Sequence, residues 1–140
     1  MNWEQIYRRK VTDVATALSV IESGNRIYVG GGAGVPIELT QGLTARAPEL
    51  ENVELTHILT FAEAPYTAPA YADSFRVNAL FIGHNVREAV NNGRADFTPV
   101  FLSEIPRLFK TGVLPIDVAL ISVSPPDAHG FCSFGVEVGT

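Results

Sequence analysis

A run of glycines between a short apolar segment and a helical pattern is the feature that most constrains the fold of this chain. The segment Arg26–Val29 predicts a strand, the loop Gly30–Pro36 follows it directly, and Pro36–Arg46 predicts a helix with proline in its first turn. Glycine lets a backbone turn sharply and lets a ligand approach closely. The pattern therefore predicts a strand–loop–helix unit of an α/β fold, and the loop is the first candidate for a functional site.

The rest of the sequence mostly alternates between strand and helix patterns. Strands are predicted over Val53–Leu59, Arg76–Ile82, Phe97–Phe101, Asp117–Val123 and Phe131–Val138, and helices over Arg8–Gly24, Val86–Asn91 and Ser103–Phe109. The continuous apolar character of Asp117–Val123 is typical of a strand buried on both faces in a parallel sheet. Phe61–Asp73 shows no period, so we expect a long loop of the kind that often carries function. This order predicts an α/β fold with an open, mostly parallel sheet flanked by helices.

Composition and charge exclude several classes of protein. The chain of 140 residues suits one domain, and its formal net charge of −5, without a basic stripe, argues against nucleic acid as a partner. No segment reaches the roughly 20 apolar residues that span a bilayer, so no membrane partner is expected. The N-terminus lacks a signal-peptide pattern and the single Cys132 excludes an internal disulfide, which together predict a cytoplasmic protein. Because the sequence stops directly after a predicted strand, at Gly139 and Thr140, we expect a truncated domain.

The glycine loop admits three interpretations on its residues alone. N–H groups at the start of the following helix could bind an anion, or could stabilise an oxyanion that develops during a reaction. The loop could equally be a tight turn packed against the sheet. Two phosphate-binding motifs fail, because no Gly-Lys-Ser/Thr is present and Val35 stands where the third glycine of the dinucleotide-binding fingerprint belongs. Pro36 also removes one N–H donor.

Other conspicuous residues have plain structural explanations beside the functional ones. Asp127, His129 and Cys132 offer three metal ligands with no second cluster, so no metal site is expected. Cys132 is expected to be a small core residue at the start of a strand. His57, inside a strand, is expected to be half-buried and hydrogen-bonded, and Glu63, in the long loop, to be exposed.

Three residues near the predicted helix Val86–Asn91 are candidates for substrate binding. His84 follows a predicted strand, which is where the sites of parallel sheets gather. Arg87 and Arg94 flank the turn that ends this helix, and either guanidinium could bind a phosphate or a carboxylate in a bidentate way. A solvated arginine on a helix face is the alternative for each.

Several segments together resemble the acetyl-CoA hydrolase/transferase family, the group that includes 4-hydroxybutyrate CoA-transferase. The most specific of them is Asp117–Gly135, where Phe134 replaces an expected leucine. The other matching segments are Val29–Leu39, Asn85–Val90, Asn92–Pro99 and Leu102–Pro106. The resemblance covers essentially the whole chain, but only the N-terminal part of the family's pattern.

The resemblance implies both a fold and an activity. Family members have two similar α/β halves, the first a NagB/RpiA-like domain, with the active site in the cleft between them. They move coenzyme A between an acyl-CoA, such as acetyl-CoA, and a short carboxylic acid, such as 4-hydroxybutyrate. A glutamate of the second half attacks the thioester, giving an acyl-glutamyl anhydride and then a glutamyl-CoA thioester. Coenzyme A is thus implied as a substrate, with no permanently bound cofactor.

For this chain the resemblance implies one wall of that cleft. The residues that match the glycine loop of the first half, which stabilises the oxyanion, are Gly31, Gly32, Ala33 and Gly34. Glu38 follows the loop on a predicted helix and does not match the motif of the nucleophile. We therefore expect no catalytic residue in this chain, an inactive isolated fragment, a C-terminal half as partner, and a homo-oligomer. His84 and Arg87 stay the candidates for contacting the acyl-CoA or the acid.

Three alternatives remain open. The family also suggests acetyl-CoA hydrolysis, in which water takes the place of the accepting acid. A non-catalytic module for a nucleotide or sugar phosphate would use the glycine loop with Arg87 or Arg94, and would bind its ligand as an isolated chain. A folding or dimerisation fragment without a site of its own would expose apolar surface and self-associate.

Overall fold

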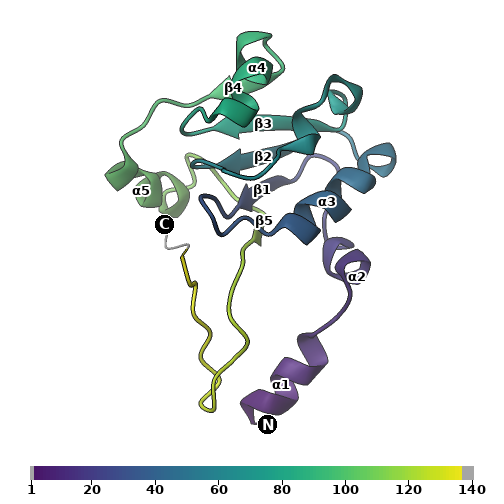
Figure 1. Cartoon of the computed structure of the whole chain (residues 1–140), viewed down its shortest axis with the longest axis vertical. Coiled ribbons are helices and arrows are strands. Elements are labelled where there is room, and N and C mark those ends of the chain that lie inside the picture. The colour runs from purple at the N-terminus through teal and green to yellow at the C-terminus, as the bar shows by residue number, and fades with distance from the viewer. Residues whose placement is uncertain (1, 137–140) are drawn as a thin grey trace.

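Five parallel strands form the centre of the computed structural model, which describes residues 2–136 (Figure 1). The strands are β1 Arg26–Val29, β2 Val53–His57, β3 Phe75–Ala79, β4 Ala95–Phe97 and β5 Val118–Leu120. Every neighbouring pair is parallel, and the order across the sheet is β4-β3-β2-β1-β5. The structure therefore confirms the α/β fold with an open parallel sheet.

The strand order places a topological switch point beside β1. From β1 the chain adds β2, β3 and β4 in turn on one side, and then crosses back to lay β5 on the other side of β1. Loops that leave β1 and β5 must therefore diverge at the carboxyl edge of the sheet. Ligand sites of open α/β sheets form in the crevice that such a divergence leaves.

Within residues 2–136, five α-helices and four short 3-10 helices precede or connect the strands. The α-helices are α1 Trp3–Lys10, α2 Val14–Leu18, α3 Ile37–Ala45, α4 His84–Asn91 and α5 Ile105–Lys110. The 3-10 helices are η1 Ala47–Glu49, η2 Pro65–Thr67, η3 Pro69–Tyr71 and η4 Leu102–Glu104. Within residues 2–136, no helix has the length and apolar character needed to cross a bilayer.

The prediction of one helix over Arg8–Gly24 is wrong, because the chain forms two separately capped helices there. The Asn2 side chain accepts a hydrogen bond from the Gln5 N–H and begins α1. The Asp13 carboxylate accepts from the Thr16 N–H at 2.9 Å and begins α2, and this bonding lowers the pKa of Asp13. The N-cap at Asp13 thus begins a new helix within a segment whose apolar period predicts one continuous helix.

Two of the predicted strands are also wrong in part or whole. The segment predicted over Phe97–Phe101 contributes only Phe97 to β4, and Phe101 is 77% exposed. Of the last predicted strand, residues 131–134 have no regular secondary structure, 135–136 form a turn, and 137–138 lie outside the described residues. The expected burial of Asp117–Val123 on both faces fails as well, because β5 is an edge strand in which Leu120 is buried and Ala119 exposed.

The apolar core joins the sheet to side chains from α2, α3, α4 and the segment after β2. Its most fully buried large members include Leu18, Ile21, Ile27, Val29, Leu43, Val53, Leu55, Tyr66 and Val77. Helices α2 and α3 cross closely at Gly42, where an added Cβ would lie 2.6 Å from Val14 Cγ1 and 2.9 Å from Leu18 Cδ1. The sequence thus uses a glycine within α3 because the neighbouring helix leaves no room for a side chain.

An arm formed by α1 and residues 121–136 extends away from the sheet (Figure 1). Its turn is held by the Asp127 carboxylate, which accepts from the N–H groups of His129 and Phe131. Trp3 of α1 packs against this turn, since a Cβ added at Gly130 would lie 2.7 Å from Trp3 Cγ. The arm therefore has local order but leaves apolar side chains such as Phe131 exposed.

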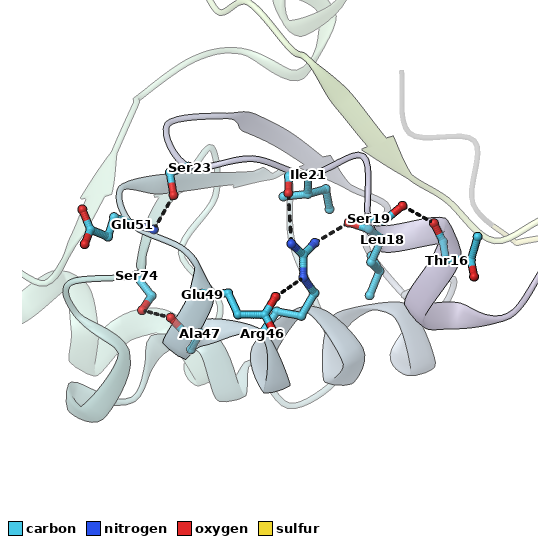
Figure 2. A network of polar contacts seen from close by, with 10 residues as sticks. All are labelled: Thr16, Leu18, Ser19, Ile21, Ser23, Arg46, Ala47, Glu49, Glu51 and Ser74. Atoms are coloured by element: carbon cyan, nitrogen blue, oxygen red, sulfur yellow. Dashed lines mark hydrogen bonds and ion pairs between the residues drawn. The ribbon is translucent and has the colours of Figure 1, made fainter.

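Arg46 holds together the connections at the amino edge of the sheet (Figure 2). Its guanidinium donates to the carbonyl oxygens of Leu18 and Ile21, which end α2 and lead into β1. The same guanidinium pairs with Glu49 at 3.2 Å in the connection to β2. One forked side chain at the end of α3 therefore ties together the segments that precede two neighbouring strands.

We predict that Arg46→Ala lowers the free energy of unfolding by about 2–3 kcal/mol, because two part-buried carbonyls lose a charged donor. Glu49→Ala is the matched control, since this carboxylate is 68% exposed and its loss should cost less than about 1 kcal/mol. Urea denaturation of both variants measures the difference. Equal midpoints would show that Arg46 acts only as a surface ion pair.

Candidate functional site

The glycine loop lies at the carboxyl edge of the sheet and is bonded on both sides. Toward β5, the Gly30 N–H donates to the Leu120 carbonyl at 2.8 Å. Toward β2, the Gly32 N–H donates to the Leu59 carbonyl at 2.6 Å and the Phe61 N–H donates back to the Gly32 carbonyl at 3.3 Å. The loop is therefore an ordered bridge between the ends of two strands that flank β1.

Two glycines of the loop are required by its geometry. A Cβ added at Gly31 would lie 2.4 Å from the Leu59 carbonyl oxygen, a distance that no side chain tolerates. Gly32 has a φ of 56°, in the left-handed region that favours glycine. For these two residues the interpretation of the loop as a tight turn packed on the sheet is thus correct. Such a turn can still present backbone N–H groups to a ligand.

The amide groups of the loop divide into paired and unpaired donors. The N–H groups of Gly30, Gly32 and Gly34 donate to backbone carbonyls, that of Gly34 to Gly31 at 3.0 Å. Across the described part of the chain, the N–H groups of Gly31, Ala33 and Val35 meet no acceptor. Unpaired amides on a fixed loop can stabilise negative charge that develops on a bound carbonyl.

A groove of about 400 Å³ follows this loop at the switch point between β1 and β5. Its walls are residues 35–39, which lead into α3, and residues 121–123, which leave β5. Pro36 is the N-cap of α3 and the helix has no side-chain cap. The carboxylate-bearing Glu38 lines the groove as well, so the site does not favour a multiply charged phosphate.

A second, more apolar groove of about 370 Å³ lies farther along the same edge, after β3 and β4. Its lining residues are Leu80, Phe81, Phe97, Pro99, Val100, Phe101 and Glu104. Sequence reasoning missed it, because the run from Phe97 to Phe101 was interpreted as a strand. The signal that could have revealed it is Pro99, since proline cannot donate to a sheet ladder.

The structure places the predicted substrate-binding residues on α4, which begins at this same edge. His84 and Arg87 are both exposed in its first turn, and their role stays a prediction. Arg94 is a different case: it donates to the Thr67 carbonyl and pairs with Glu88 at 3.4 Å. Its guanidinium is therefore engaged in tying the long loop to α4, which does not fit the proposed anion site.

The Asp127–Cys132 segment forms the turn of the arm. The Asp127 carboxylate accepts from the N–H groups of Phe131 and His129, which lowers the pKa of Asp127, and its main-chain carbonyl accepts from the Gly130 N–H. Cys132 is exposed, so the prediction of a core cysteine is wrong. No group of three potential metal ligands occurs among residues 2–136. Glu63 is exposed, as predicted.

His57 is the most unusual polar residue near the site. It is fully buried at the end of β2, and neither ring nitrogen has a hydrogen-bond partner within the described structure. Burial lowers its pKa to about 4, so the ring is neutral at physiological pH. Tyr66 lies 6.4 Å away between ring centroids, and burial likewise raises the pKa of its unpartnered hydroxyl. The prediction of a half-buried, satisfied histidine is therefore wrong.

Comparison with solved structures defines the class of this fold. RipA from Yersinia pestis superposes with a TM-score of 0.84 at 24% identity, covering 97% of this chain and 34% of that protein. A 4-hydroxybutyrate CoA-transferase from Porphyromonas gingivalis superposes with a TM-score of 0.71 at 28% identity, covering 95% of this chain and 30% of that protein. The fold is that of the N-terminal domain of CoA-transferases.

Sequence comparison then gives the family. The family model for the acetyl-CoA hydrolase/transferase N-terminal domain matches residues 1–140, and the chain belongs to this family. It is 43% identical over 137 residues to 4-hydroxybutyrate coenzyme A transferase of Clostridium kluyveri, covering 98% of the chain and 32% of the relative. A succinyl-CoA:acetate/propanoyl-CoA:succinate CoA transferase of Fasciola hepatica is 43% identical over 120 residues, covering 84% of the chain and 25% of the relative. The chain thus spans a third or less of the length of these relatives.

We predict that Gly31→Ala lowers the free energy of unfolding by about 1–3 kcal/mol, because the new methyl group would collide with the Leu59 carbonyl. Ala33→Ser, on the exposed part of the same loop, should change it by less than about 0.5 kcal/mol. Chemical denaturation compares the two variants. A Gly31→Ala protein as stable as the wild type would show that the loop can move away from Leu59 without cost.

We also predict a pH dependence of stability that originates in His57. Its pKa is 6.5 when unfolded and about 4 when folded, so protons bind the unfolded chain preferentially between these values. Stability is full above pH 6.5 and falls as the pH drops toward 4, by about 3 kcal/mol in total. Denaturation midpoints of wild type and His57→Leu across this range give the test, and parallel pH profiles would contradict the assignment.

Proposed function

We propose that this chain is the N-terminal half of a CoA-transferase that moves coenzyme A between an acyl-CoA and a short carboxylic acid. The observation that carries the proposal is the glycine loop, a rigid bridge with unpaired amides at the switch point of the sheet. The family membership and the relatives, all described as CoA transferases, support the same class of reaction. No catalytic residue is assigned to this chain.

In the proposed reaction the loop stabilises negative charge on the thioester oxygen. A glutamate carboxylate from the second half adds to the thioester carbon. The carbon–sulfur bond then breaks and the coenzyme A thiolate departs, so that an acyl-glutamyl anhydride remains on the enzyme. The thiolate then attacks the glutamyl carbonyl and releases the first acid as its carboxylate, forming a glutamyl-CoA thioester. The carboxylate of the second acid attacks this thioester and expels the coenzyme A thiolate, which gives a second acyl-glutamyl anhydride. The thiolate finally attacks the acyl carbonyl of that anhydride, forming the new acyl-CoA and freeing the glutamate carboxylate. Each addition places charge on a carbonyl oxygen, which amides such as those of Gly31 and Ala33 would stabilise.

The apolar groove and the start of α4 suggest where the acyl chain and the charged groups of the substrates lie. The apolar groove beside Phe97 and Phe101 suits a short acyl chain such as butyryl or 4-hydroxybutyryl. His84 and Arg87, exposed at the start of α4, would contact the carboxylate or the coenzyme A. Coenzyme A enters and leaves as a substrate, and the mechanism needs no permanently bound cofactor.

The exposed apolar side chains of the arm fit the expectation of further protein partners. Phe131 and Phe134 are 73% and 53% exposed, and large apolar side chains exposed together are typical of a surface that binds another protein. We propose that a C-terminal half and further copies of the chain are the partners, in the cytoplasm. Glu38 and Pro36 at the first groove weigh against the alternative of a nucleotide or sugar-phosphate module.

The test is transfer of coenzyme A from acetyl-CoA to 4-hydroxybutyrate by the complete protein that contains this domain. We expect exchange by the complete protein, loss of at least about 10³-fold when the glutamate of the second half becomes alanine, and no exchange by residues 1–140 alone. Acetyl-CoA consumption without an acceptor acid would instead indicate the hydrolase. Equal exchange with and without the glutamate would overturn the mechanism.

A further inference from the structure

The segment Leu59–Ala62, which we name the strap, is what the glycine loop rests on. Its Leu59 carbonyl accepts from the Gly32 N–H, and its Phe61 N–H donates to the Gly32 carbonyl. The strap also forms the steric wall at Gly31, through the same Leu59 carbonyl oxygen. The place and direction of the loop amides therefore depend on where the strap lies.

One side chain from α4 holds the strap on its other side. The Asn85 side-chain amide donates to the Thr60 carbonyl at 3.1 Å and to the Ala62 carbonyl. The reverse orientation would set the Asn85 oxygen against both carbonyls, so the two contacts require the nitrogen as donor. The Oδ1 atom is buried and has no partner among residues 2–136, so the hydrogen bonds of this amide go to the strap alone.

The bonds of Asn85 are not needed to anchor α4 itself. Val86 and Ala89 of this helix are buried in the core and fix it against the sheet. Asn85 instead clamps carbonyls at alternate positions of the strap, and the residues between and beside them are those that bond Gly32. The path from α4 to the glycine loop thus runs from the Asn85 side chain to the backbone of the strap, and from there through backbone hydrogen bonds to Gly32.

We infer that Asn85 is a positioning residue for the glycine loop, an inference that rests on the proposed function. It touches no reacting atom; it fixes the strap, and the strap fixes Gly32 and the unpaired amides on either side. Stabilisation of a developing oxyanion depends on donors within a fraction of an ångström of their ideal place. Asn85 therefore acts on the rate of the chemical step and little on binding of the acyl-CoA.

The test replaces Asn85 by aspartate in the complete enzyme. Asn85→Asp keeps the shape, removes both donors and points a carboxylate at two carbonyls. We expect kcat to fall about 10- to 100-fold with KM for acyl-CoA changed less than about threefold. In residues 1–140, hydrogen exchange at the Gly32 and Phe61 amides should become faster.

Asn91→Asp is the matched control, because it makes the same change of charge at an exposed position of the same helix. It should leave kcat and the exchange of Gly32 unchanged. If circular dichroism shows that Asn85→Asp does not fold, Asn85→Ala removes the donors without adding charge and carries the same expectations.

The outcomes separate the two proposals. A wild-type enzyme without CoA transfer would overturn the proposed function whatever Asn85 does. With an active wild type, an Asn85 variant that matches Asn91→Asp in kcat and in Gly32 exchange would overturn the positioning role. An Asn85 variant with a raised KM but unchanged kcat and unchanged hydrogen exchange of the Gly32 amide would also overturn the positioning role.

Discussion

The close approach of the Gly31 backbone to the Leu59 carbonyl is the constraint on which the site depends. It requires a residue without a side chain and brings the loop near enough for the reciprocal bonds between Gly32 and the strap. Those bonds consume the amide of Gly32 and leave its neighbours unpaired. The steric requirement at Gly31 therefore also determines which backbone N–H groups of the loop stay available to a ligand.

The two edges of the sheet have different tasks. At the amino edge, Arg46 joins the connections into β1 and β2 with charged hydrogen bonds to carbonyls (Figure 2). At the carboxyl edge, the contacts are mostly between backbone groups, and apolar grooves lie open. His57 sits beneath that edge as a neutral, unpartnered ring, a cost to stability that side-chain packing must offset. The charged hydrogen bonds of Arg46 therefore lie at the edge opposite the candidate site.

The strand–glycine–helix unit and the parallel sheet could be predicted from the sequence because both depend on local patterns. The apolar run in Arg26–Val29, the glycines that follow it and the proline at Pro36 carry that information within a few residues. What failed depends on distant partners: Arg94 bonds a carbonyl 27 residues away, and within the described residues the segment after β5 has no neighbouring strand to pair with. His57 shows the same limit. The alternating pattern places it in a strand, but the pattern alone does not say whether the side chains that surround the imidazole are polar or apolar. The roles of Gly31–Gly34, His84 and Arg87 stay predictions.

The position of β5 beside β1 has a consequence for how the site comes into being. Gly30 is bonded to Leu120, and the Arg26 N–H donates to Asp117, 91 residues later in the chain. During synthesis the first four strands can therefore pair before the glycine loop has its second support. Because contacts between such distant residues form late, the candidate site is among the last parts of the domain to be completed on the ribosome.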